Sequence, residues 1–300
     1  MRTSAPRVTH PEVIAVFGPT ASGKSTVAEA LADTLATEVV SADALQVYRG
    51  LPILTNQPGR PTRLVAIREL AKEMSVGEYA GLAHAAIDEL VDANGAAVIA
   101  GGTGLYLRAA LVDMAVPPAP GPGTRERWEA VYDADPTAAY ARLDELDPVA
   151  AAAVHPNDRR RVVRALELAE AGASLVPADG RLWSQEMRRP TVVVGLDLPR
   201  EALERRIRER TEEMFARGVV EEVRRALRKP VSRTAEKALG LRELAELSPD
   251  AAFERIVART QRYAAYQRKW MRRIPGVVMI GADRSPAEVA DAILEVARAR

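Results

Sequence analysis

The residues best suited to chemistry lie near the start of the chain, where the run GPTASGKS fills positions 18–25. It matches the pattern GxxxxGK[ST], in which glycines let backbone N–H groups converge on phosphate oxygens. The lysine adds a positive charge, and the last hydroxyl can bind Mg²⁺. An apolar run at 13–17 precedes the motif and a helical pattern follows it, which is the context that phosphate binding requires. The motif predicts a phosphate or diphosphate site, and a glycine-rich turn without phosphate is the alternative.

Two further polar residues follow predicted strands. Asp43 comes after Val39-Val40, and Thr103 follows the apolar run at 96–100 within the sequence GGTG. Ligands of parallel α/β sheets bind at the carboxyl ends of strands, so both residues are expected to face the phosphate loop. The run at 96–100 ends without an acid, which counts against a motor-type ATPase. On this pattern alone, Asp43 is more often a helix N-cap and Thr103 a turn residue.

Composition sets the framework for these residues. The chain has 300 residues, of which 47% are hydrophobic, and this supports a packed core in about two domains, or in one domain with a large insertion. The 42 Lys and Arg nearly balance the 41 Asp and Glu, so a basic surface for a partner must be local. Cysteine is absent, which excludes disulfides, a thiolate nucleophile and Cys-bound metals.

Short apolar runs that alternate with helical patterns predict a parallel sheet. Strands are expected at 13–17, 39–40, 96–100, 191–196 and 277–280, with a helix over 76–92. The run PPAPGPG at 117–123 indicates a boundary. Beyond it, to about residue 178, helical patterns are broken at Pro136, Pro148, Pro156 and Pro177. We therefore predict a P-loop NTPase-like α/β core with C-terminal helices, at 1–118 and 179–300, and an inserted all-helical domain at 119–178.

Five blocks of sequence, in order, carry a family resemblance. They are GPTASGKS at 18–25, SADALQVYRG at 41–50, GGTGLYLRA at 101–109, LDPVAAAAVHPNDRRRVVRALEL at 146–168 and RTQRYAAYQRKWMRR at 259–273. Together they resemble the tRNA dimethylallyltransferases, which modify an adenosine beside the anticodon. The resemblance covers roughly nine-tenths of the chain, from about Val13 to Arg273.

The resemblance implies roles for the candidate residues. The phosphate loop would hold the diphosphate of dimethylallyl diphosphate rather than ATP, with Mg²⁺ at Ser25. Asp43 would be the base for the adenine N6, Thr103 would lie near the reacting centre, and Arg210 would contact the diphosphate, a solvated helix arginine being the alternative. The expected diphosphate-binding residues are Gly18, Pro19, Thr20, Ala21, Ser22, Gly23, Lys24 and Ser25.

Basic residues at helical spacing suit an RNA surface. In the helix after Asp158, Arg160 and Arg164 are expected opposite the apolar face and free for phosphates. In the later helix that includes the last block, Arg262, Tyr266, Lys269 and Arg273 share one stripe, and Ile256, Tyr263, Trp270 and Ile274 form a separate apolar stripe. Solvated charge around packed helices is the alternative. The expected contacts of the tRNA anticodon stem-loop are Asp43, Ala44, Leu45, Gln46, Arg125, Arg160, Arg161, Arg164, Lys237, Gly240 and Arg242.

Two other functions stay open at this point. The same core suits an ATP-dependent small-molecule or nucleotide kinase, with the insertion as its lid. Departures from the family pattern, at Ala44, Thr62, Leu241 and Ala265, favour a catalytically weak tRNA-binding protein. No apolar run is long enough to span a membrane, and the N-terminus lacks the apolar region of a signal peptide. We therefore expect a cytoplasmic enzyme, and the resemblance leans to a monomer.

Overall fold

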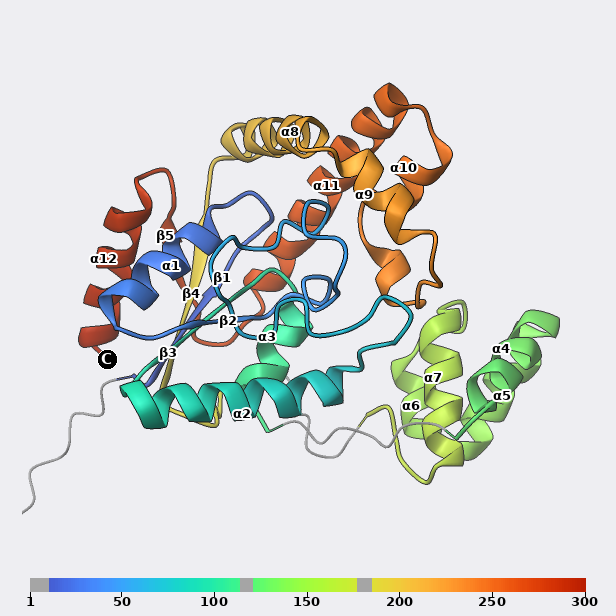
Figure 1. Ribbon diagram of the computed structural model, residues 1–300. Helices are drawn as coiled ribbons and strands as arrows, with labels where there is room; N and C mark the ends of the chain where they lie inside the picture. Colours follow the sequence, from blue (N-terminus) through green and yellow to red (C-terminus); the bar gives the residue numbers. More distant parts are fainter. Residues whose placement is uncertain (1–10, 114–120, 177–184) are drawn as a thin grey trace, which may run out of the picture. The chain divides into compact units, whose positions relative to one another are not determined.

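The computed structural model describes residues 11–113, 121–176 and 185–300. Its centre is an all-parallel sheet of five strands in the order β2-β3-β1-β4-β5 (Figure 1). The strands are β1 Val13–Phe17, β2 Val39–Ser41, β3 Ala97–Gly101, β4 Thr191–Asp197 and β5 Val278–Gly281. Each predicted strand is confirmed to within about a residue at either end. Their β-branched and alanine-rich runs are largely buried because helices cover both faces of a parallel sheet.

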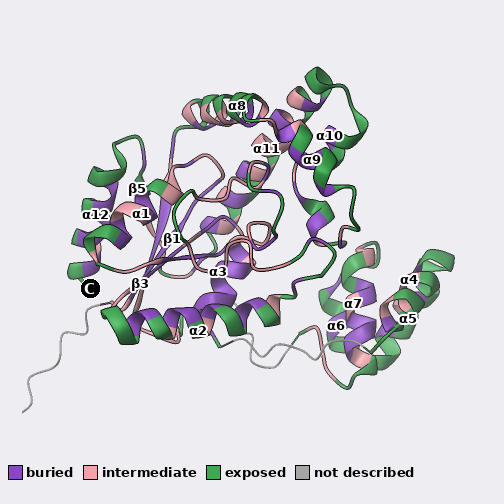
Figure 2. Ribbon diagram, viewed as in Figure 1, coloured by how far each residue is buried: buried purple, intermediate pink, exposed green. Residues whose placement is uncertain are grey.

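Helices connect the strands and cover the sheet. In Figure 1, α1 and α12 lie together on one side of the sheet, and α2 and α3 pack against each other on the other. Their sheet-facing sides are buried, as the purple ribbon in Figure 2 shows. The helices of this unit are α1 Lys24–Thr34, α2 Val76–Asn94, α3 Gly104–Leu111, α8 Arg200–Ala216, α9 Val219–Ala226, α10 Leu241–Glu246, α11 Pro249–Met271 and α12 Pro286–Arg298, with a 3₁₀ turn at Ala235–Lys237.

The chain divides into two compact units, one formed by 1–112 with 185–300 and the other by 113–184. The predicted boundaries at 118 and 178 lie outside the described residues. The described part of the second unit holds only helices: α4 Thr124–Ala134, α5 Pro136–Leu146, α6 Pro148–Ala153 and α7 Arg159–Glu170. The prolines that indicated breaks at 136 and 148 begin α5 and α6, where Asp135 and Asp147 accept hydrogen bonds from the first turn. A small core of its own, including Leu143, Val162 and Leu166, holds the unit together.

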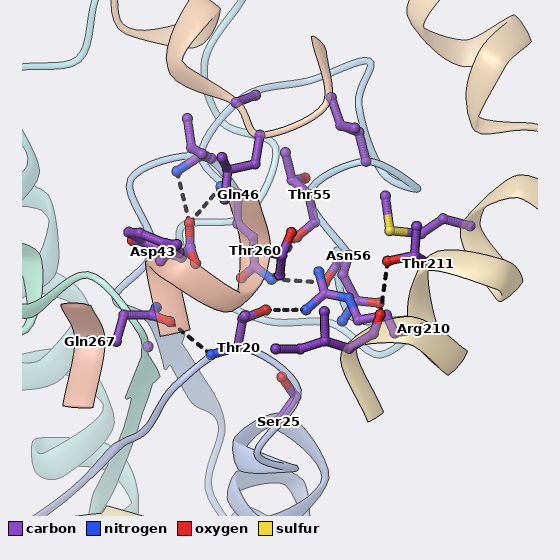
Figure 3. A pocket seen from close by; sticks show the side chains of 18 of the residues that line it. Thr20, Ser25, Asp43, Gln46, Thr55, Asn56, Arg210, Thr211, Thr260 and Gln267 are labelled. Carbon is purple, nitrogen blue, oxygen red and sulfur yellow. Dashed lines mark hydrogen bonds between the residues drawn. The ribbon is translucent and has the colours of Figure 1, made fainter. Parts of the chain in front are cut away.

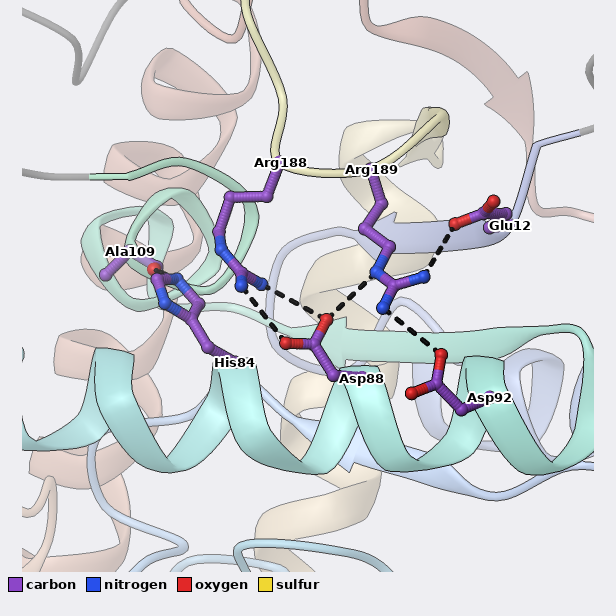
Figure 4. A network of polar contacts seen from close by, with 7 residues as sticks. All are labelled: Glu12, His84, Asp88, Asp92, Ala109, Arg188 and Arg189. Atoms are coloured by element: carbon purple, nitrogen blue, oxygen red, sulfur yellow. Dashed lines mark hydrogen bonds and ion pairs between the residues drawn. The ribbon is translucent and has the colours of Figure 1, made fainter.

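Two arginines fix the chain where it re-enters the core before β4 (Figure 4). The guanidinium of Arg188 bonds the Asp88 carboxylate of α2 at 3.1 Å, and that of Arg189 bonds Asp88 at 2.9 Å and Glu12 at 3.1 Å. Burial alone would raise the pKa of Asp88, but the hydrogen bonds from the two arginines lower it below its ordinary value. The network joins β1, α2 and the segment that leads into β4.

No helix in the described part of the chain combines the length and the apolar character needed to cross a membrane.

Candidate functional site

One pocket opens over the carboxyl ends of the central strands (Figure 3). Its volume is about 910 Å³, counting the space open to solvent. The walls come from the phosphate loop, the loop after β2, and the helices α8 and α11. The polar lining residues include Thr20, Lys24, Ser25, Asp43, Gln46, Arg210, Thr211, Thr260 and Gln267. The structure thus brings the predicted phosphate loop, the aspartate and Arg210 to one place, as the strand-end rule indicated.

The phosphate loop bends sharply into α1. Ala21 and Gly23 both have left-handed φ values, of 62° and 86°, and α1 begins at Lys24. No acidic residue occupies the first turn of α1, so the positive end of the helix faces the pocket uncompensated. Lys24 donates to Pro19 O at 3.3 Å. Burial lowers the pKa of Lys24 to about 8; Asp43 opposes this change, and the neighbouring Arg210 contributes to it. This arrangement favours an anion.

Asp43 lies in a turn. Its Oδ1 accepts hydrogen bonds from Leu45 N at 2.9 Å and Gln46 N at 3.4 Å. The helix N-cap alternative is wrong, because residues 44–47 form a turn and the next helix begins at Val76. One carboxylate oxygen therefore fixes the loop, and among the described residues no side chain bonds Oδ2, which is left for a ligand.

Thr103 connects two loops of the site. It precedes α3, but its side chain does not cap that helix. Instead, Thr103 Oγ1 accepts from Ala44 N at 3.2 Å, next to Asp43. Thr103 therefore supports the Asp43 loop, and its expected position near the reacting centre stays a prediction.

Arg210 extends from α8 into the pocket. Its Nη1 donates to Thr20 Oγ1 of the phosphate loop. Its Nε is buried, and it has no hydrogen-bond partner among the described residues. Burial lowers the pKa of Arg210, and Asp43 and Glu213 oppose that change. The alternative of a solvated arginine is wrong, because Arg210 lines the pocket, bonds Thr20 and has its Nε shielded from solvent. A buried N–H without a partner is costly, so a ligand that accepts from Nε would stabilise this arrangement.

Two polar side chains have structural roles that the sequence analysis did not predict. Gln46, expected as an RNA contact, accepts from Ser41 Oγ at 2.8 Å and donates to Asn56 O at 2.8 Å, so its amide braces the loop around residue 55. The buried carboxylate of Glu222 accepts from Ile53 N at 2.9 Å and Leu54 N at 2.8 Å. No motif marks Glu222, because its partners are backbone groups about 170 residues away along the chain.

Helix α11 differs from its expected pattern. Arg262, Tyr266, Lys269 and Arg273 are exposed as expected, Arg273 just beyond the end of the helix. Ile256 and Ile274 are buried, but the apolar stripe also includes the polar Gln267, which is 3% exposed. Gln267 lies in the last block of the family resemblance, the one signal that pointed to it.

The expected RNA contacts fall into two groups. Near the pocket, Lys237 ends the 3₁₀ turn, Gly240 has a left-handed φ of 100°, and Ala238 and Leu239 line the pocket wall. Arg242 is exposed and lies 3.5 Å from Glu236.

The second group lies in the helical unit. Arg160 and Arg161 are exposed on α7. The expectation that Arg164 is free is wrong, because it bonds the buried carboxylate of Glu167 at 2.9 Å. Arg125 lies 3.7 Å from that same carboxylate and 3.3 Å from Glu129. The helical spacing placed Arg164 away from the apolar face but could not show that a buried acid pairs with it.

Comparison with known proteins gives one consistent result. The model of the IPP transferase family matches residues 46–274, and that of isopentenyl transferases matches residues 11–70. The chain is 39% identical to the tRNA dimethylallyltransferase of Kineococcus radiotolerans, over 95% of this chain and 96% of the relative. It is 41% identical to the tRNA dimethylallyltransferase of Thermobifida fusca, over 88% of each.

Solved structures agree with the sequence matches. A full-length tRNA isopentenylpyrophosphate transferase from Bacillus halodurans superposes with a TM-score of 0.67 at 28% identity, covering 96% of this chain and 94% of that one. A eukaryotic dimethylallyltransferase described as acting on tRNA gives a TM-score of 0.76 at 25% identity, covering 90% of this chain and 73% of that one.

Proposed function

Because the chain belongs to the IPP transferase family, we propose that it transfers a dimethylallyl group from dimethylallyl diphosphate to N6 of the adenosine at position 37 of tRNA, releasing diphosphate. The chain is a tRNA-modifying prenyltransferase, and the names of its relatives favour this function over a kinase or a binding protein without catalysis. One observation of the site supports the residue roles most: two partly buried cations, Lys24 and Arg210, line the same pocket as the Asp43 carboxylate.

The phosphate loop is suited to hold the leaving group. As the bond between the allylic carbon and oxygen breaks, the diphosphate takes the electron pair and gains negative charge. The backbone N–H groups of the loop, Lys24 and Arg210 are already oriented toward that charge, so they stabilise the transition state more than the ground state. The Nε of Arg210 has no hydrogen-bond partner in the part of the chain that the structure describes, and a diphosphate oxygen would accept from it.

Asp43 is the proposed base. The N6 lone pair forms the new bond to the allylic carbon while the diphosphate departs, and the amine proton passes to Asp43 Oδ2. The amine becomes strongly acidic only as it is alkylated, so a carboxylate suffices as the base. An adenine stacked in the anticodon loop cannot reach this pocket. The target adenine is therefore flipped out of the stack before the transfer.

Mg²⁺ is the proposed metal, because Ser25 offers a hard oxygen in the pocket. No group of three or more His, Cys, Asp or Glu side chains that could hold a metal ion occurs in the described ranges. That fits Mg²⁺, which typically takes one or two protein ligands, several waters and substrate phosphates. Bound there with the diphosphate, the ion would neutralise charge on the leaving group.

The direct test is product formation. We expect that incubating the protein with unmodified tRNA, Mg²⁺ and dimethylallyl diphosphate, followed by nuclease digestion and mass spectrometry, yields N6-dimethylallyladenosine. A tRNA with guanosine at position 37 is the matched control and should yield none. ATP turnover with a small acceptor, in place of prenyl transfer, would instead support a kinase, and tight tRNA binding without product would support a binding protein.

The lowered pKa of Lys24 predicts how pH affects diphosphate binding. Below pH 8 the free protein carries the Lys24 charge, and above it the charge is lost, so kcat/KM for dimethylallyl diphosphate should fall as pH rises through about 8. At saturating substrate kcat should vary less, because the bound anion raises the pKa of Lys24. Steady-state rates between pH 6.5 and 9.5 check this. In a Lys24→Arg variant the decline should disappear, and a wild-type profile without an inflection in this range would contradict the assignment.

A further inference from the structure

Gln267 is a buried, uncharged residue whose two amide atoms bond two different loops of the site. It lies on α11 at 3% exposure. Its Oε1 accepts from Thr20 N at 2.8 Å, and its Nε2 donates to Gly102 O at 2.8 Å. Because one partner is a donor and the other an acceptor, the side chain at this position must both accept and donate, as an amide does in this orientation.

On one side, Gln267 supports the leaving-group site. Thr20 belongs to the phosphate loop, and its hydroxyl accepts from Arg210 (Figure 3). A chain of hydrogen bonds therefore runs from α11 through the phosphate loop to α8. These bonds hold the Arg210 guanidinium at a fixed position relative to the phosphate loop.

On the other side, Gln267 supports the loop that positions the base. Gly102 is followed by Thr103, whose hydroxyl accepts from Ala44 N next to Asp43. A Cβ atom at position 102 would clash with the Gln267 amide nitrogen, so a side chain there would displace the Gln267 amide. Tyr263, one turn earlier on α11, also lines the pocket, and burial raises its pKa to about 12.

We propose that Gln267 is a positioning residue that sets the separation between the leaving-group site and the base. The inference rests on the proposed function. Displacement at the allylic carbon needs N6, carbon and leaving oxygen in line, and a misplacement of about 1 Å can cost roughly 100-fold in rate. A neutral amide adds no charge to the transition state, so its effect is geometric.

The test compares two substitutions of Gln267. Gln267→Met keeps the approximate size and removes both hydrogen bonds, so we expect kcat to fall about 30- to 100-fold at all pH values. The affinity for inorganic diphosphate should change less than about fivefold, because Lys24 and the N–H groups of the loop remain. This division between kcat and binding separates a change of geometry from a loss of the site.

Gln267→Glu supplies a signature that a purely structural role would not show. A protonated carboxyl accepts from Thr20 N and donates to Gly102 O, as the amide does, whereas a carboxylate repels that carbonyl. The variant's rate relative to wild type should therefore be near one at pH 5.5 and fall at least tenfold by pH 8. The other titratable groups that line the pocket are Lys24, Asp43, Arg210 and Tyr263. They are present in both proteins, so dividing the rate of the variant by the wild-type rate at each pH removes most of their effect.

Arg268→Ala is the matched control. Arg268 is the next residue of α11, but its guanidinium bonds Asp197 at 2.6 Å and Leu198 O at 3.0 Å, and it does not line the pocket. We expect a lower melting temperature and an unchanged rate per titrated active site. No product from the wild-type protein would overturn the proposed function. Two other outcomes would overturn only the positioning role. One is a wild-type protein that forms product and a Gln267→Met variant whose rate is within threefold of it. The other is a Gln267→Glu variant that loses the same factor in rate at every pH.

Discussion

Replacing Asp43 with asparagine will lower the rate of dimethylallyl transfer by at least 100-fold, since a positioned general base contributes about 10²- to 10⁴-fold. The amide oxygen can still accept from Leu45 N and Gln46 N, so the turn is retained while the proton acceptor is lost. Asp43→Ala should lose the same factor and in addition loosen the turn. Single-turnover transfer to tRNA, followed by quenching and mass spectrometry, measures both variants.

The charge of Asp43 also affects how diphosphate binding depends on pH, and this gives a second measurement. Asp43 raises the pKa of Lys24, so its removal should move the inflection in diphosphate binding below pH 8, and rates are best compared near pH 7. Binding of inorganic diphosphate at that pH should remain within a fewfold of wild type. Transfer within tenfold of wild type in Asp43→Ala would show that another group accepts the proton.

Replacing Arg210 with methionine will reduce kcat/KM for dimethylallyl diphosphate by roughly 10- to 100-fold. Hydrogen bonds to charged groups contribute about 1.5–3 kcal/mol, and the Nε donor is already buried and preorganised for an anion. Arg210→Lys should recover only part of the rate, because an ammonium cannot bond Thr20 and a phosphate oxygen with the geometry of a guanidinium.

Arg208 on the same helix provides the comparison. It is exposed and pairs with Glu254, so Arg208→Met should keep transfer within twofold of wild type. Arg210 also lowers the pKa of Lys24, and its loss should therefore move the pH inflection above 8. An unmoved inflection together with an unchanged kcat/KM would place Arg210 outside the diphosphate site.

Local sequence patterns predicted the fold well because the signals were short-range. Buried parallel strands appear as apolar runs, the phosphate loop has a fixed spacing, and prolines mark the starts of helices in the inserted unit. Asp43 and Thr103 each follow a predicted strand, and this indicated that both lie near the phosphate loop, since the carboxyl ends of parallel strands meet at one edge of the sheet.

Contacts between distant segments could not be predicted in this way. From the sequence, Arg210 could be either a diphosphate contact or a solvated helix arginine. Only the packing of α8 shows that it lies against the phosphate loop. Gln267 and Glu222 bond backbone groups, and backbone partners leave no trace in side-chain patterns. The amphipathic pattern of α7 placed Arg164 away from the apolar face. It could not show that Glu167 is buried and pairs with Arg164, so that this arginine is not free.

The backbone bond between Arg188 N and Leu111 O, at 2.9 Å, has a consequence for folding kinetics. β3 and β4 both pair with β1, although the intervening chain includes the 72 residues from Asp113 to Ser184. The entropic cost of closing a loop grows with its length. Because Leu111 and Arg188, which flank the inserted segment, meet at this bond, a loop of this length must close before β3 and β4 can both pair with β1. A core in which a few residues replace 113–184 should then assemble faster than the full chain with an unfolded insertion.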